Sequence, residues 1–147
     1  QRMPKSLSET FADPAHYPYL SVCTTSTHDM NPLRAWWEEN RELSERFYRE
    51  VLGMEGDAPR TCEPWICRRI VDMHLRSPAM LAILPLQDWL ATDAALRSPH
   101  ADRERINIPA APRYYWRYRM HLTLEELLRQ EPFNATLREM IIAGGRR

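Results

Sequence analysis

The segment Thr27-His28-Asp29 combines the residue types most suited to chemistry in this sequence. It follows residues 20–25, whose β-branched side chains predict a strand, and precedes a predicted helix that begins at Asn31 and Pro32. A carboxylate placed there could stabilise positive charge developing on a substrate, and the imidazole could donate a hydrogen bond to a hydroxyl. The structural alternative is that Asp29 helps to cap the helix, with His28 merely adjacent.

Two other polar or aromatic clusters invite functional and structural interpretations. Gln87 and Asp88 end an apolar run, where they either take part in a site or mark the point at which a buried strand reaches water. A second cluster could stack on nucleic-acid bases or on sugar rings, or could pack its tyrosines on the core while its arginines pair with carboxylates. This cluster comprises Tyr114, Tyr115, Trp116 and Tyr118, interleaved with Arg113, Arg117 and Arg119.

The cysteines predict neither a metal site nor a disulfide framework. The spacing Cys62-x4-Cys67 is unusual for zinc and has no matching second pair, so we expect buried or inert thiols. With Cys23 they make an odd number, which favours a reducing compartment and a cytoplasmic location. No glycine-rich phosphate loop occurs, and we expect no metal and no cofactor.

Length and composition indicate one globular domain. The 147 residues are too few for a complete (β/α)₈ barrel, and a 44% hydrophobic, 27% charged composition excludes disorder. Twenty basic and twenty acidic side chains balance, which argues against a nucleic-acid partner. No apolar run approaches the roughly 18 residues of a membrane span. We therefore expect a soluble protein, whose first residue, Gln1, does not correspond to a start codon.

Prolines and hydrophobic spacing divide the first two thirds of the chain into elements. Residues 1–19, with three prolines and no sustained period, predict an irregular N-terminal segment. Apolar residues at helical spacing predict one helix from Pro32 to Gly53 and another from Pro64 to Ser77. The continuous apolar run 79–86 predicts a strand buried on both faces, followed by a short helix over 90–96.

The last third predicts a long loop and two helices. Residues 98–121 are mostly loop, and Thr123-Leu-Glu-Glu126 matches a capping box that opens a helix with Leu124, Leu127 and Leu128 facing inward. A final helix is expected over 134–143. Two apolar parallel strands without further neighbours would leave unpaired backbone groups on both edges. The sequence therefore predicts an α/β slice of a larger β/α array.

Five motifs, in order, give the sequence a specific resemblance. They are STHDM (26–30), LRAWWEE (33–39), LPLQDWL (84–90), RINIP (105–109) and YWRYRM (115–120). Together they resemble the C-terminal part of the catalytic domain of amylomaltases, the 4-α-glucanotransferases or disproportionating enzymes of glycoside hydrolase family 77. The resemblance extends from about Tyr17 to the end of the chain. It implies that residues 1–147 form a single incomplete domain, the C-terminal portion of a (β/α)₈ barrel, with about two parallel strands in mostly helical surroundings.

The resemblance also implies a chemistry and a set of site residues. Enzymes of this family transfer α-1,4-glucan segments by a retaining double displacement that uses an aspartate nucleophile, a glutamate acid/base and a third carboxylate. Asp29 matches the third carboxylate and His28 the sugar-binding histidine, while Asn107 and Trp116 match positions near the acceptor side of the groove. Expected partners are maltooligosaccharides and the remainder of the catalytic domain, with no nucleic acid and no membrane.

No part of the sequence resembles the motifs of the nucleophile or of the acid/base. The chain alone is therefore expected to be inactive, although the complete protein would transfer glucans. Two alternatives remain: a fragment of a related α-glucan hydrolase, in which water replaces the sugar acceptor, and a non-catalytic interaction module. The helices between residues 31 and 77 would supply the partner face of such a module.

Overall fold

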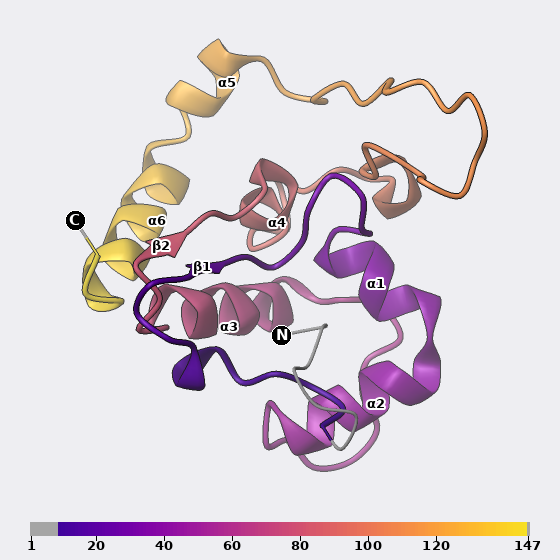
Figure 1. The fold of residues 1–147 in the computed structure, drawn as a ribbon. Helices are drawn as coiled ribbons and strands as arrows, with labels where there is room; N and C mark the ends of the chain where they lie inside the picture. The colour runs from indigo at the N-terminus through magenta and orange to yellow at the C-terminus, as the bar shows by residue number, and fades with distance from the viewer. Residues whose placement is uncertain (1–8, 147) are drawn as a thin grey trace.

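Two short parallel strands lie among helices in the computed structural model, which describes residues 9–146 (Figure 1). β1 (Val22–Cys23) and β2 (Leu81–Ala82) pair in register Val22 to Leu81. Backbone hydrogen bonds extend the pairing on both sides, because the Met80 amide donates to the Tyr19 carbonyl and the Ile83 amide to the Cys23 carbonyl. The predicted α/β character and the predicted parallel pair are confirmed.

β2 is shorter and more exposed than the sequence predicts. Only two residues of the run 79–86 form the strand, because Pro85 directly precedes the helix α4 (Leu86–Leu90). The helix predicted over 90–96 is thus found about four residues earlier. The prediction that this strand is buried on both faces is wrong for this chain, since Leu81 is 46% and Ile83 60% exposed. Within the described residues β1 is the strand that pairs with β2, so the other edge of β2 has no strand partner there.

The single helix predicted from Pro32 to Gly53 is two helices, α1 (Leu33–Glu39) and α2 (Arg41–Glu50). Asn40 lies between them with φ −139° and ψ 107°, an extended conformation that ends the first helix. Its side-chain oxygen then accepts the Leu43 amide at 3.0 Å and caps the second. The apolar spacing continues across the break, which is why periodicity alone predicts one helix.

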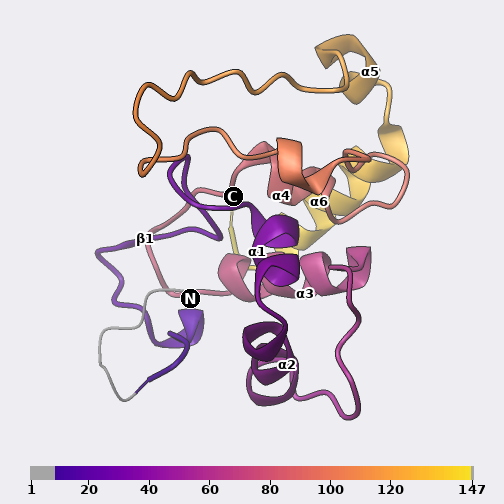
Figure 2. The same cartoon turned by 90° about the vertical axis from the view of Figure 1, so that its right-hand side faces the viewer.

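The main core lies between the α1–α2 pair and α3 (Pro64–Leu75), with α3 passing beneath the strands (Figures 1 and 2). Buried side chains of α3 include Ile66, Ile70 and Val71, and they share this core with Trp37 and Phe47. The aromatic rings meet edge to face, the arrangement that aromatic quadrupoles favour. This core holds α1, and with it the loop after β1, in a fixed position.

An irregular stretch leads to the two C-terminal helices, α5 (Leu124–Leu128) and α6 (Glu131–Ala143). The predicted capping box is confirmed, with Thr123 and Glu126 as reciprocal partners. The expectation that Leu124 and Leu128 face inward is wrong, since both are exposed. α6 begins three residues earlier than predicted and contributes Met140 and Ile141 to the core.

The N-terminal part is irregular over most of residues 9–19, as predicted, apart from a short 3₁₀ helix, η1 (Pro14–His16). The remainder of the predicted segment, residues 1–8, lies outside the described residues. None of the helices in the described part of the chain is long and apolar enough to span a membrane.

Candidate functional site

The loop that leaves β1 presents His28 and Asp29 at its outer end. A turn closes there, because the Met30 amide donates to the Thr27 carbonyl at 3.1 Å. The side chains of His28 and Asp29 are both about half exposed, with His28 Nε2 3.4 Å from Asp29 Oδ1. The sequence-predicted pair is thus accessible to a ligand on the carboxyl side of the strand.

A second loop, distant in sequence, brings Asn107 to Asp29. Asn107 Nδ2 donates to Asp29 Oδ1 at 2.6 Å, and the Asn107 amide donates to the His28 carbonyl at 3.0 Å. Arg105 supports the same junction through Nη2, which donates to the Asp29 carbonyl at 3.3 Å. One carboxylate oxygen is therefore oriented by an amide donor.

Trp116 completes the cluster from the aromatic segment. Its ring lies 5.1 Å from the His28 ring, centroid to centroid, at an angle of 44°. The indole is 62% exposed and the neighbouring Tyr115 ring is also exposed, with the Arg117 guanidinium 5.6 Å from its centroid. The alternative in which these aromatic side chains pack on the core is therefore wrong for Tyr115.

All four residues selected from the sequence, His28, Asp29, Asn107 and Trp116, thus meet in one place. They offer a carboxylate for positive charge, an imidazole and an amide for hydroxyl groups, and an aromatic face. This combination fits a polyhydroxylated ring, because a sugar presents hydroxyls at its rim and C–H groups on its faces.

The carboxylate that caps α1 belongs to Asp88. Its Oδ1 accepts the Leu33 amide at 2.8 Å, whereas Asp29 contacts Asn107. The capping interpretation of Asp29 is wrong, while Asn31, the other predicted cap, donates through Nδ2 to Glu39 Oε2 at 2.9 Å. The cap by Asp88 was not predicted because Asp88 lies 55 residues beyond the start of α1, outside the range of local sequence signals.

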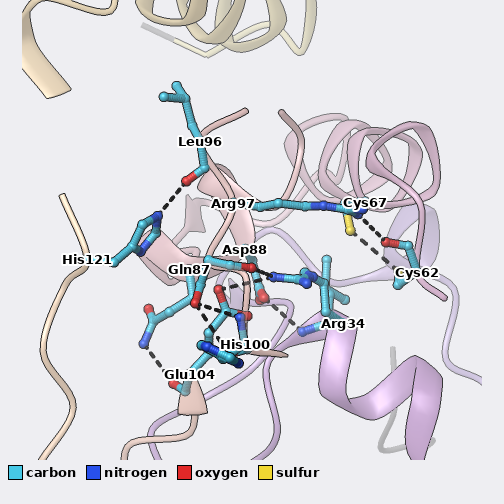
Figure 3. A network of polar contacts seen from close by, with 12 residues as sticks. Arg34, Cys62, Cys67, Gln87, Asp88, Leu96, Arg97, His100, Glu104 and His121 are labelled. Atoms are coloured by element: carbon cyan, nitrogen blue, oxygen red, sulfur yellow. Dashed lines mark hydrogen bonds and ion pairs between the residues drawn. The ribbon is translucent and has the colours of Figure 1, made fainter. Parts of the chain in front are cut away.

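Arg34, Gln87, Asp88 and Glu104 belong to a buried polar network (Figure 3). Arg34 Nη1 lies 3.6 Å from Glu104 Oε1 and donates to the Ser98 carbonyl at 2.6 Å. Burial raises the pKa of Glu104 to about 7, opposed by Arg34 and assisted by Asp88. Sequence reasoning missed this pair because an arginine and a glutamate 70 positions apart carry no local signal.

The cysteines are buried free thiols, as predicted. The sulfur atoms of Cys62 and Cys67 lie 3.4 Å apart, and burial raises the pKa of the Cys62 thiol well above its ordinary value. Among residues 9–146, no three His, Cys, Asp or Glu side chains gather in a way that could hold a metal ion.

The cluster of His28, Asp29, Asn107 and Trp116 is a candidate carbohydrate site in an α/β protein. Sequence comparison identifies the family. The chain belongs to the 4-α-glucanotransferase family, whose sequence model matches residues 1–124. This membership confirms the resemblance drawn from the motifs and favours it over the alternative of a non-catalytic interaction module.

Curated relatives agree with the family assignment. The chain is 42% identical over 146 residues to the 4-α-glucanotransferase DPE2 of Oryza sativa subsp. japonica, a match that covers 99% of this chain and 15% of that protein. It is 33% identical over 129 residues to the 4-α-glucanotransferase of Chlamydia pneumoniae, covering 87% of this chain and 24% of that protein. The chain therefore spans between about one seventh and one quarter of the length of these relatives.

Proposed function

We propose that the complete protein containing this chain is a 4-α-glucanotransferase. It transfers α-1,4-glucan segments between maltooligosaccharides, or onto glucose, by a retaining double displacement. The observation that carries this proposal is the Asp29 carboxylate, held by Asn107 beside His28 and the exposed Trp116 at a strand end. The names of the relatives support the same activity.

Within this proposal the chain forms the C-terminal portion of a (β/α)₈ barrel, as a single incomplete domain. The exposed apolar residues of the strand pair support this placement, because neighbouring barrel strands and helices would cover them. These residues are Leu20, Val22, Met80, Leu81 and Ile83. The remainder of the catalytic domain is then the main partner of this chain.

Asp29 acts in the proposed mechanism on an oxocarbenium-like transition state. Positive charge develops at the anomeric carbon and ring oxygen, and a fixed carboxylate stabilises that charge more than it stabilises the neutral substrate. Because Asn107 donates to Oδ1, the second carboxylate oxygen can face the sugar. His28 would donate to a hydroxyl, and Trp116 would pack against the face of a glucose ring.

The nucleophile and the acid/base belong, in this proposal, to the rest of the complete protein. The chain of 147 residues alone would bind sugar weakly and transfer none. We also propose a cytoplasmic location, which the three free thiols support.

Asp29→Asn in the complete protein tests the proposed role. The amide keeps the shape and an acceptor for Asn107, but it removes the charge, so turnover of maltotriose should fall by roughly 10²–10³-fold. The measurement is the rate of formation of glucose and longer oligosaccharides, with the circular dichroism spectrum as a check on folding. Asp13→Asn, an exposed carboxylate that caps η1, is the matched control.

Unchanged turnover in Asp29→Asn would contradict the role of this carboxylate. The products of the wild-type protein decide between transfer and hydrolysis. Longer oligosaccharides formed together with glucose indicate transfer, whereas shortened products alone would indicate the related α-glucan hydrolase.

A further inference from the structure

Gln87 and Asp88 stand side by side in the first turn of α4, and both are buried, whereas the side chains of His28 and Asp29 are about half exposed. Asp88 is 0% exposed and Gln87 4%. The expectation that this pair marks the point where a strand reaches water is therefore wrong. Figure 3 shows the two side chains within the buried polar network, together with Arg34 and Glu104.

Asp88 holds the loop that carries His28 and Asp29 from both of its ends. Its Oδ2 accepts the Thr25 hydroxyl at 2.5 Å and the Ser26 hydroxyl at 2.9 Å. Its Oδ1 accepts the Leu33 amide at 2.8 Å, beyond the turn. One carboxylate thus fixes the distance between the two ends of the loop, and Asp29 lies between them.

Gln87 holds the second loop, which carries Asn107. Its Nε2 donates to the Glu104 carbonyl at 3.2 Å, three residues before Asn107. The Glu104 side chain in turn pairs with Arg34, which lies on α1 next to the residue that Asp88 caps. The two loops are therefore anchored to adjacent residues of one short helix.

We propose that Gln87 and Asp88 are positioning residues, which set the contact between Asp29 and Asn107 by clamping the two loops that carry them. The proposed function supplies the reaction in which this positioning acts. Since a misplacement of about 1 Å in a catalytic group can lower a rate by roughly 10²-fold, the clamp should affect turnover more than binding. Neither residue contacts substrate in this proposal.

Three variants remove different hydrogen bonds of Gln87 and Asp88 and so test how much each residue contributes to holding the loops. Asp88→Ala leaves two hydroxyl donors and one amide donor in a buried site without their acceptor. Asp88→Asn keeps one oxygen for the Leu33 amide and offers an NH₂ group that the oxygens of Thr25 and Ser26 can accept. Gln87→Leu keeps the approximate size of the side chain but removes the donor to Glu104.

The experiment measures amide hydrogen exchange by peptide mass spectrometry, together with kcat and KM for maltotriose, in the complete protein. Asp88→Ala should raise exchange in residues 25–33 by at least about tenfold and lower kcat by roughly 10²-fold, while KM changes by less than about threefold. Asp88→Asn should retain more than a tenth of kcat. Gln87→Leu should raise exchange in residues 104–109 and leave residues 25–33 protected.

Asp93→Asn is the matched control, because Asp93 Oδ1 accepts the nearby amides of Ala95 and Leu96. Unchanged exchange in both loops of the variants would overturn the proposal. Exchange that rises throughout the protein in Asp88→Asn and Gln87→Leu would also overturn it, since the residues would then support the fold in general. If the wild-type protein transfers no glucan, the proposed function fails, and the exchange results still decide whether the clamp exists.

Discussion

Trp116 is the residue of the candidate site whose contribution is easiest to isolate, because most of its ring is exposed and its recorded ring contact is with His28. In the complete protein, Trp116→Ala should weaken oligosaccharide binding by roughly tenfold, since the sugar loses its aromatic face. Isothermal titration with maltotetraose measures the dissociation constant. Trp65→Ala removes another exposed tryptophan, on α3, and is the control. A dissociation constant equal to that of the wild type would exclude Trp116 from the site.

Glu104 gives the protein a pH dependence with a defined sign. Its pKa is about 7 in the folded chain against 4.5 in the unfolded one, chiefly because burial disfavours the charge. Between pH 4.5 and pH 7 the unfolded chain binds fewer protons than the folded one. The free energy of unfolding therefore falls as the pH rises from about 4.5 to about 7, and it is constant above that range. Glu104→Gln should remove this change in the free energy of unfolding, about 3 kcal/mol in total. Urea unfolding from pH 4.5 to 8 measures it, and parallel profiles for the two proteins would contradict the assignment.

Elements that depend on local signals were predictable from the sequence. Pro64 begins α3, and the capping box at Thr123 opens α5, because both signals act within one helical turn. The break at Asn40 was missed because its extended conformation interrupts a hydrophobic spacing that otherwise continues. β2 was overestimated because an apolar run shows only that residues can be buried, whereas Leu81 and Ile83 are exposed in this chain.

Gly144 determines how closely α6 approaches α3. A Cβ atom built on Gly144 would lie 2.9 Å from Leu75 Cβ and 3.0 Å from the Leu75 carbonyl oxygen. Gly144→Ala should therefore push the end of α6 away from α3 and destabilise the protein by about 1–3 kcal/mol. Thermal unfolding measures the loss, and Ala143→Ser, at the neighbouring exposed position, is the control. Equal melting temperatures for Gly144→Ala and the wild type would show that the helices can separate without cost.

At the scale of the whole molecule, the residues of the candidate site could be predicted from the sequence, but the residues that hold them in place could not. The motifs selected His28, Asp29, Asn107 and Trp116, and the structure brings them together. The contacts of Asp88 could not be predicted in the same way, because they join residues 55 to 63 positions apart and depend on where α4 packs. Long-range burial of a polar side chain has no periodic pattern.

The exposed strand pair carries the last prediction, which concerns the completion of the barrel. Ile83 is 60% exposed in this chain, whereas the proposed neighbouring strands would bury it. A cysteine at this position, Ile83→Cys, should react readily with a maleimide in the 147-residue chain, in which the native cysteines are buried. In the complete protein the same cysteine should react at least about 100-fold more slowly, because labelling then requires local opening.

Peptide mass spectrometry identifies the label at residue 83 in both proteins, and Glu139→Cys, on an exposed position of α6, serves as the control. The control should react equally in the chain and in the complete protein, because Glu139 is exposed and lies outside the strand pair that the barrel would extend. Slow labelling confined to residue 83 then requires a covering element from outside this chain. If Ile83→Cys reacts equally fast in both proteins, the strand edge stays open and the placement of this chain within a (β/α)₈ barrel is wrong.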